Sequence, residues 1–154
     1  GFNPCKPTSK GSLQICSPDP LAAPEMHSNY LDTDYDKAVM LAGMRLMRKI
    51  AQTPALSAVI DTELYPGVEI ESDADMADFL REKSWTVFHQ CGTCRMGQDA
   101  KTSVVDERLR VHGVAGLRVA DASIFPTIPT GNTNAPAIMV GEMASKLIRQ
   151  DAKK

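Results

Sequence analysis

His89 is the residue in this sequence with the clearest capacity for acid–base chemistry. It follows the apolar run 85–88 and precedes a glycine at position 92, a pattern that predicts a short buried strand ending in a turn. Because an unperturbed imidazole titrates at about 6.5, a histidine at a strand end is well suited to exchange a proton near neutral pH. An alternative stays open, in which His89 is half-buried and only hydrogen-bonds a carbonyl group.

Cys91 and Cys94 form a second group of reactive residues, spaced as Cys-Gly-Thr-Cys. This spacing is compatible with a redox dithiol or with half of a zinc site. A dithiol centre would place its first cysteine at a helix N-terminus, whereas the intervening Gly-Thr predicts a turn. Zinc would need two further ligands, which Cys5 and Cys16 are not spaced to supply. We therefore expect two structural thiols and no metal site.

Asp121 lies where a weakly alternating run, residues 116–120, gives way to small and acidic residues. A strand that ends at such a turn presents a carboxylate and backbone amides together, and the alternative is that Asp121 only caps the turn. A proline-rich loop then leads to a helix that Asn134 is expected to cap and whose first turn contains Pro136. Asn132 therefore stands just before a helix N-terminus, whose partial positive charge favours anions and electron-rich carbonyl groups.

Two further helices are predicted upstream of these residues. Thr33, with Asp32, can cap a helix over residues 34–51, and either Ser72 or Asp73 can cap another over residues 72–82. The side chains expected to face a core are Val39, Gly43, Leu46, Met47 and Ile50 in the first helix, Met76, Phe79 and Leu80 in the second, and Ile138, Val140, Ala144, Leu147 and Ile148 in the C-terminal helix. A flexible binding face is the alternative role for three methionines of the first helix, but core packing is expected for Met40, Met44 and Met47.

Composition excludes several classes of protein. The chain has 154 residues, 43% of them hydrophobic, and a net charge of −2, so nothing suggests a basic nucleic-acid surface. No apolar run approaches the roughly 20 residues of a membrane span. Four cysteines are too few and too irregularly spaced for a disulfide scaffold, which leads us to expect a reducing, cytoplasmic location.

Ordered motifs along most of the chain carry a resemblance to a known family. They are His89 with GTCRMG, then VVD, LRVHGV, GLRVADASIFP and TGNTNAP, preceded by KPTSKGSLQI, SPDP, NYL and ELYPG. Together these segments resemble the C-terminal part of the glucose-methanol-choline (GMC) family of FAD-dependent alcohol oxidoreductases, nearest in pattern to choline-dehydrogenase-like members.

The resemblance implies roles for individual residues. His89 matches the histidine that takes the proton of the substrate hydroxyl, and Asn132 matches a residue that hydrogen-bonds the same substrate oxygen. Asp121 and Ala122 match the segment that touches the FAD phosphate and ribityl region, while Asn132 and Thr133 match the amides that approach the pyrimidine edge of the flavin. The His–Asn pairing is chemically reasonable, because an alcohol releases a hydride easily only as it becomes an alkoxide. FAD and a small primary alcohol are therefore the expected cofactor and substrate.

The predicted fold class is α+β. We expect an antiparallel sheet with packed helices as a substrate-binding region that includes the histidine, residues 1–96, and a C-terminal strand and helix, within residues 97–154, that complete the FAD-binding domain of a parent enzyme. Short strands are predicted at residues 12–16, 104–106 and 109–111.

The dinucleotide fingerprint GxGxxG is absent from the chain, which begins at Gly1 rather than methionine. We therefore expect a C-terminal fragment whose Rossmann-like FAD-binding part lies upstream. Such a fragment should be inactive alone and should expose apolar surface that associates with the upstream segment or with a second copy. The alternative function is a non-catalytic module that binds a ligand or a partner.

Overall fold

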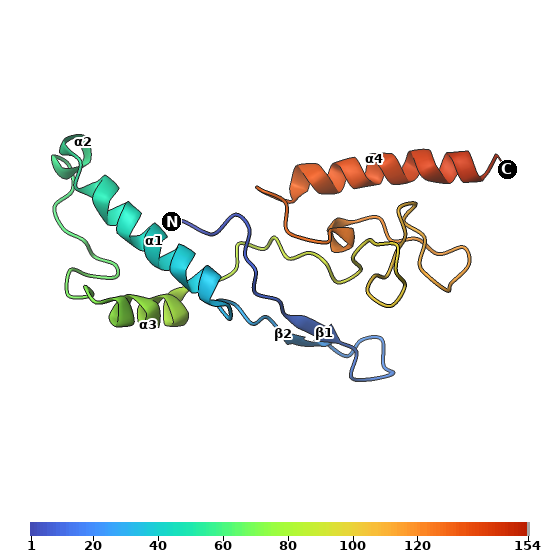
Figure 1. The fold of residues 1–154 in the computed structure, drawn as a ribbon, viewed down its shortest axis with the longest axis horizontal. Coiled ribbons are helices and arrows are strands. Elements are labelled where there is room, and N and C mark those ends of the chain that lie inside the picture. The colour runs from blue at the N-terminus through green and yellow to red at the C-terminus, as the bar shows by residue number, and fades with distance from the viewer. Residues whose placement is uncertain (154) are drawn as a thin grey trace. The chain divides into compact units, whose positions relative to one another are not determined.

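The computed structural model describes residues 1–153, which form two compact units, Gly1–Thr86 and a second that begins at Val87 (Figure 1). This boundary separates two groups of residues that make most of their contacts within their own group. The boundary predicted after residue 96 concerns the roles of the two parts, and it stays a prediction. In the structure, His89 belongs to the second unit, together with the GTCRMG motif that follows it.

In the first unit a small antiparallel sheet consists of β1 (Ser12–Gln14) and β2 (Glu25–His27), with Leu13 opposite Met26. The strand predicted over residues 12–16 is thus confirmed in a shorter form. Every residue of both strands is exposed. Together with the helices described below, this sheet confirms the mixed α+β class.

Three helices complete the first unit: α1 (Asp34–Ala51), α2 (Pro54–Ser57) and α3 (Asp73–Lys83). The predicted caps of the two longer helices are confirmed, because Thr33 Oγ1 accepts a hydrogen bond from the Asp36 amide at 3.3 Å and Ser72 Oγ accepts one from the Asp75 amide at 3.1 Å. Each of these helices also carries acidic residues in its first turn and basic residues in its last turn, which complements the helix dipole.

The core of the first unit lies between α1 and α3, but it uses a different face of α1 from the predicted one. Met40 and Met44 are buried against Met76 and Leu80, which confirms core packing for these two methionines. The predicted residues of the C-terminal half of α1 are exposed instead, with 56% of Leu46 accessible. The physical reason is that α3 has 11 residues against 18 in α1, so α3 covers only part of the longer helix and leaves much of its C-terminal half exposed.

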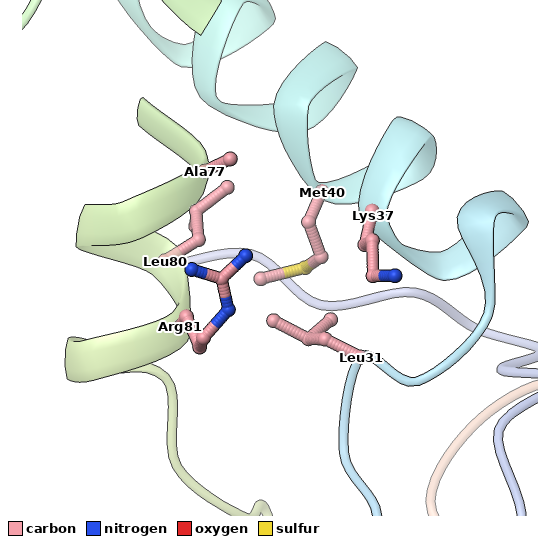
Figure 2. A pocket seen from close by; sticks show the side chains of 6 residues that line it. All are labelled: Leu31, Lys37, Met40, Ala77, Leu80 and Arg81. Atoms are coloured by element: carbon pink, nitrogen blue, oxygen red, sulfur yellow. The ribbon is translucent and has the colours of Figure 1, made fainter. Parts of the chain in front are cut away.

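A small hollow opens between α1 and α3 beside this core (Figure 2). Figure 2 shows Met40 of α1 and Leu31 opposite Leu80 and Ala77 of α3, with Arg81 beside them. None of the residues that line it was predicted to take part in a site.

Arg48 of α1 anchors the bend that contains the ELYPG motif. Its guanidinium donates to both carboxylate oxygens of Glu63 at 2.8 to 3.1 Å, and also to the carbonyl oxygens of Gly67 at 2.9 Å and Ile70 at 2.6 Å. Gly67 has φ of +106°, a backbone conformation that favours glycine, and the chain bends sharply there.

The second unit packs the helix α4 (Asn134–Asp151) against an irregular chain that contains the short 3-10 helix η1 (Ala122–Ile124). Its buried residues are Val105, Leu109, Ile124, Val140 and Ala144. Of the predicted core face of α4, Val140 and Ala144 are buried, whereas Ile138 and Ile148 are 62% and 50% exposed. The prediction is wrong for these two residues because only one side of α4 is covered within the unit.

The strands predicted after the GTCRMG motif are reduced to isolated bridges. Val105 bridges both Met96 and Val111, and Arg110 bridges Arg118. The strand expected over residues 116–120 is therefore a single bridged position. The extended segments are too short to form a ladder, because turns at residues 107–108, 112–113 and 115–116 separate the bridged positions.

Ion pairs connect the C-terminal end of α4 to these loops. Asp151 forms ion pairs with Arg108, at 2.6 Å, and with Arg118. Hydrogen bonds from these two arginines hold the pKa of Asp151 below its usual value.

Within residues 1–153, the structure contains no helix with both the length and the apolar character needed to cross a membrane.

Candidate functional site

The segment that carries His89 differs from its prediction. Residues 84–90 form no strand, Phe88 adopts a left-handed φ of +59°, and Trp85 and Phe88 are 80% and 71% exposed. The predicted buried strand is therefore wrong: an apolar run forms a strand only where a neighbouring strand completes its hydrogen bonds. The predicted turn after the histidine is present, with Gly92 at φ of +93°.

His89 is half-buried and contacts the entrance of α4. Its Nδ1 lies 3.0 Å from Thr133 Oγ1, although the two residues are 44 positions apart in the sequence. This hydrogen bond places the imidazole next to the residue that follows Asn132. The structure thus brings two of the predicted site residues, His89 and Thr133, into direct contact and places Asn132, which is exposed, one residue away.

The GTCRMG motif is bound to η1 through its backbone. The amide of Cys94 donates to the carbonyl of Ser123 at 3.0 Å, and the amide of Met96 donates to the carbonyl of Ile124 at 2.8 Å. A side chain on Gly92 would lie 3.3 Å from the Phe125 carbonyl oxygen, so the glycine permits this close approach. The motif after His89 is therefore held beside the predicted cofactor segment.

Asp121 and Ala122 lie at the start of that segment. Asp121 is exposed, and its Oδ1 accepts a hydrogen bond from the Ser123 amide at 2.8 Å, which caps η1. Ala122 is half-buried. The capping role is thus observed, and it leaves the second carboxylate oxygen at the surface of the unit.

The N-terminus of α4 begins one residue earlier than predicted. Thr133, rather than Asn134, is the N-cap, and its side chain makes no capping hydrogen bond. Asn134 and Ala135 supply backbone N–H groups in the first turn, while Pro136 has none to supply. An uncapped helix start of this kind fits an electron-rich group such as the flavin ring, because its amides and its dipole both favour negative charge.

Cys91 and Cys94 are both free thiols, as are Cys5 and Cys16. Burial raises the pKa of the Cys91 thiol, so less of it is thiolate at a given pH. Among residues 1–153, no group of three His, Cys, Asp or Glu side chains is arranged to hold a metal ion.

Arg95, within the GTCRMG motif, and His112, further along the chain, make local contacts. Arg95 donates through Nε to the carbonyl of Thr102. His112 Nε2 lies 3.1 Å from both Ser103 Oγ and the Gly97 carbonyl oxygen. Both contacts join the two ends of the loop over residues 97–103.

Sequence reasoning overlooked the side chain of Thr133. The resemblance implies a role only for its backbone amide, and the residue expected to cap the helix is Asn134. No local pattern predicted that its hydroxyl would contact His89.

The chain matches known proteins in both sequence and structure. A family model described as GMC oxidoreductase matches residues 7–141. The chain is 45% identical over 141 residues to an oxygen-dependent choline dehydrogenase of Klebsiella pneumoniae, which covers 92% of this chain and 25% of that protein. A choline dehydrogenase of Vibrio vulnificus is 41% identical over 146 residues, 94% of this chain and 26% of that protein.

Solved structures give the same result. Pyridoxine 4-oxidase from Mesorbium loti superposes with a TM-score of 0.88 at 33% identity, over 95% of this chain and 28% of that chain. Formate oxidase from Aspergillus oryzae superposes with a TM-score of 0.90 at 31% identity, over 97% of this chain and 26% of that chain. The chain belongs to the GMC oxidoreductase family, a family of flavoproteins, and it spans about a quarter of the length of the relatives that it matches.

Proposed function

We propose that this chain is the C-terminal substrate-binding and catalytic portion of an FAD-dependent oxidoreductase that acts on the CH–OH group of a primary alcohol. The observation that carries the proposal is the contact between His89 and Thr133, because it places an imidazole at the start of α4 beside Asn132. Alcohol oxidation requires one group that takes a proton and one group that hydrogen-bonds the substrate oxygen.

His89 is the proposed catalytic base. With Nδ1 bonded to Thr133, its Nε2 is the nitrogen left to accept the proton of the alcohol. Asn132 is the proposed donor that stabilises the substrate oxygen as the proton leaves, through its side-chain amide and through its place before a helix N-terminus.

The residues proposed to hold FAD are Asp121, Ala122, Asn132 and Thr133. Asp121 and Ala122 begin η1, where a carboxylate and backbone amides meet, and Asn132 and Thr133 precede the uncapped amides of α4. When bound, FAD would supply the chemistry that this chain lacks, by accepting the hydride from the alcohol carbon. The reaction then balances, since the proton goes to His89 and the alcohol becomes an aldehyde.

Further parts of the proposal concern the rest of the protein. An upstream FAD-binding segment of the same protein is the proposed partner, and the isolated chain is expected to be inactive because that segment holds most of the cofactor. The proposed functional division assigns residues 1–96, including His89, to substrate binding and residues 97–154 to completing the FAD domain. A cytoplasmic location is proposed from the sparse and irregular cysteines.

Choline is one candidate substrate, because relatives of this chain are choline dehydrogenases. The aromatic content of 5% argues against a large aromatic cage of the kind that binds a quaternary ammonium group. The proposed class is therefore primary alcohols in general.

A second candidate function is a non-catalytic module that binds a ligand or a partner.

A flavin titration separates the two functions. The chain would be produced alone and together with its upstream segment, titrated with FAD, and exposed anaerobically to a panel of primary alcohols that includes choline. We expect the joined protein to bind flavin and to lose its yellow colour with at least one alcohol. A joined protein that remains colourless would contradict the enzymatic proposal and favour the binding module.

A further inference from the structure

The N-cap residue of α4 differs from the N-cap residues of α1 and α3. Thr33 and Ser72 have extended backbones, with ψ of 149° and 153°, and each side chain accepts a bond from an amide of its own helix. Thr133 has a helical backbone, with φ of −79° and ψ of −8°, and it makes no such bond. Its hydroxyl contacts His89 Nδ1 at 3.0 Å instead.

This difference changes which interaction the threonine side chain stabilises. A threonine N-cap typically stabilises its helix through the hydrogen bond that its side chain accepts. In α4 that contribution is replaced by a contact with a residue 44 positions earlier. A side chain that leaves its local partner for a half-buried imidazole is arranged to control that imidazole.

We propose that Thr133 is the positioning residue of His89 and that its hydroxyl accepts a hydrogen bond from Nδ1–H. The inference rests on the proposed function for the role of His89, and it adds how the ring is held and which ring nitrogen carries the proton. A neutral imidazole carries one N–H, and a hydroxyl can either accept from Nδ1–H or donate to a bare Nδ1, so a base at Nε2 requires that the hydroxyl accept.

In the proposed state, Nδ1–H donates to Thr133 Oγ1, which leaves the lone pair on Nε2. Nε2 is then free to accept the proton of an alcohol without a prior exchange of tautomers. After that transfer both nitrogens carry protons, and the bond from Nδ1 to the hydroxyl persists, so the ring keeps its orientation through the step.

The first test observes the tautomer without using activity. The full-length protein, labelled with 15N in its histidine side chains, would be studied by NMR near neutral pH, with His89→Gln used to assign the signals. We expect His89 to show a protonated Nδ1 and an unprotonated Nε2. A wild-type protein in which Nε2 carries the proton of neutral His89 would overturn the inference, whatever the variants do.

The second test uses three variants of the full-length protein. Thr133→Val removes the hydroxyl and keeps the shape, Thr133→Ser keeps a hydroxyl, and Thr127→Val changes an exposed threonine of the preceding loop. Anaerobic stopped-flow measurements over a range of alcohol concentrations give the limiting rate of flavin reduction and the apparent dissociation constant of the alcohol.

Thr133→Val should lower the limiting rate about 3- to 10-fold, the equivalent of one neutral hydrogen bond, with the dissociation constant changed less than about twofold. Thr133→Ser should recover most of the rate, and Thr127→Val should match the wild type. Flavin reduction by Thr133→Val at the wild-type rate, in a protein where His89→Gln is slow, would contradict the positioning role. If no alcohol reduces the wild-type flavin, the proposed function fails instead, and the NMR result still decides the tautomer.

Discussion

At the scale of single residues, His89 combines two features that suit a base: it is half-buried, and one ring nitrogen is bonded to Thr133. The ring is therefore oriented through its Nδ1. His27 offers a contrast within the same chain, since it is exposed and pairs with Glu25 at 2.8 Å. Of these two histidines, His89 is the one for which we propose proton transfer from a bound substrate.

Replacing His89 by alanine should lower turnover of the full-length protein by about 100-fold or more, because the general base is lost. Flavin should remain bound, since His89 is not among the residues proposed to hold FAD. Steady-state kinetics and the flavin absorbance measure the two properties. His27→Gln is the matched control and should keep normal kinetics. Near-normal turnover of His89→Ala would remove this residue from the mechanism.

Cys91 should react slowly with iodoacetamide, because burial raises its pKa and the thiolate is the reactive form. A raised pKa means that labelling of Cys91 should require a higher pH than labelling of an exposed thiol. The exposed Cys5 and Cys16 should be labelled first. Mass spectrometry of peptides at successive times gives the order.

Labelling of Cys91 as fast as that of Cys5 would contradict a structural role for this thiol. An independent check is Cys91→Ser, which should leave the metal content and thiol redox behaviour of the protein unchanged. A change in either property would revive the zinc or dithiol hypothesis.

At the scale of elements, Asp36 joins the N-terminal segment to the start of α1. The carboxylate is 1% exposed and accepts hydrogen bonds from the amides of Thr8 and Ser9, both at 2.8 Å, and from their hydroxyl groups at 3.1 and 2.5 Å. Ser9 Oγ in turn accepts from the amides of Asp32 and Thr33. The start of α1 is thus fixed by a polar network around a buried charge.

Asp36→Asn should destabilise the first unit by about 2 to 3 kcal/mol, because an amide cannot accept all of these bonds. Burial alone would raise the pKa of Asp36, but the hydrogen bonds from Ser9 and Thr8 outweigh it and hold the pKa below 3.8. A depressed folded pKa means that the contribution is present above pH 3.8 and is lost as the pH falls through the folded value.

Urea unfolding of both proteins at several pH values measures this difference. The gap between wild type and Asp36→Asn should be full at pH 7 and should shrink in acid. Asp34→Asn is the control, since Asp34 is exposed and pairs only with Lys37 in the first turn, at 3.4 Å. A gap that is equally large at pH 3 and pH 7 would show that the charge of Asp36 is not the cause.

At the scale of the whole molecule, large apolar side chains remain exposed in both units. Leu21 and Ile15 are 92% and 86% accessible in the first unit, and Ile138 and Met139 are 62% and 56% accessible on α4. Soluble monomers rarely keep large continuous apolar patches exposed. The exposed side chains agree with a chain that spans a quarter of its relatives.

The isolated chain should therefore bind a hydrophobic dye and associate, and production with the upstream segment should suppress both effects. Dye fluorescence and light scattering at several protein concentrations measure them. Ile138→Ser, on the exposed side of α4, should weaken association more than Lys146→Ser, which changes an exposed polar residue of the same helix. A clean monomer without dye binding would count against the prediction.

Local patterns in the sequence were sufficient for several features. The capped helix α1, the capped helix α3 and the family were all predicted, because caps, periodicity and motifs depend on residues close together in the chain. The same reasoning failed for the strand before His89 and for the core face of α1, because these depend on which neighbour covers a segment.

The sequence by itself determined that His89, Asn132 and Thr133 belong to motifs of GMC oxidoreductases. Only the tertiary structure decided that the imidazole meets the hydroxyl of Thr133 and that the GTCRMG motif lies against η1. The physical reason is that a hydrogen bond across 44 residues depends on how loops close and helices pack, and no local periodicity encodes that geometry.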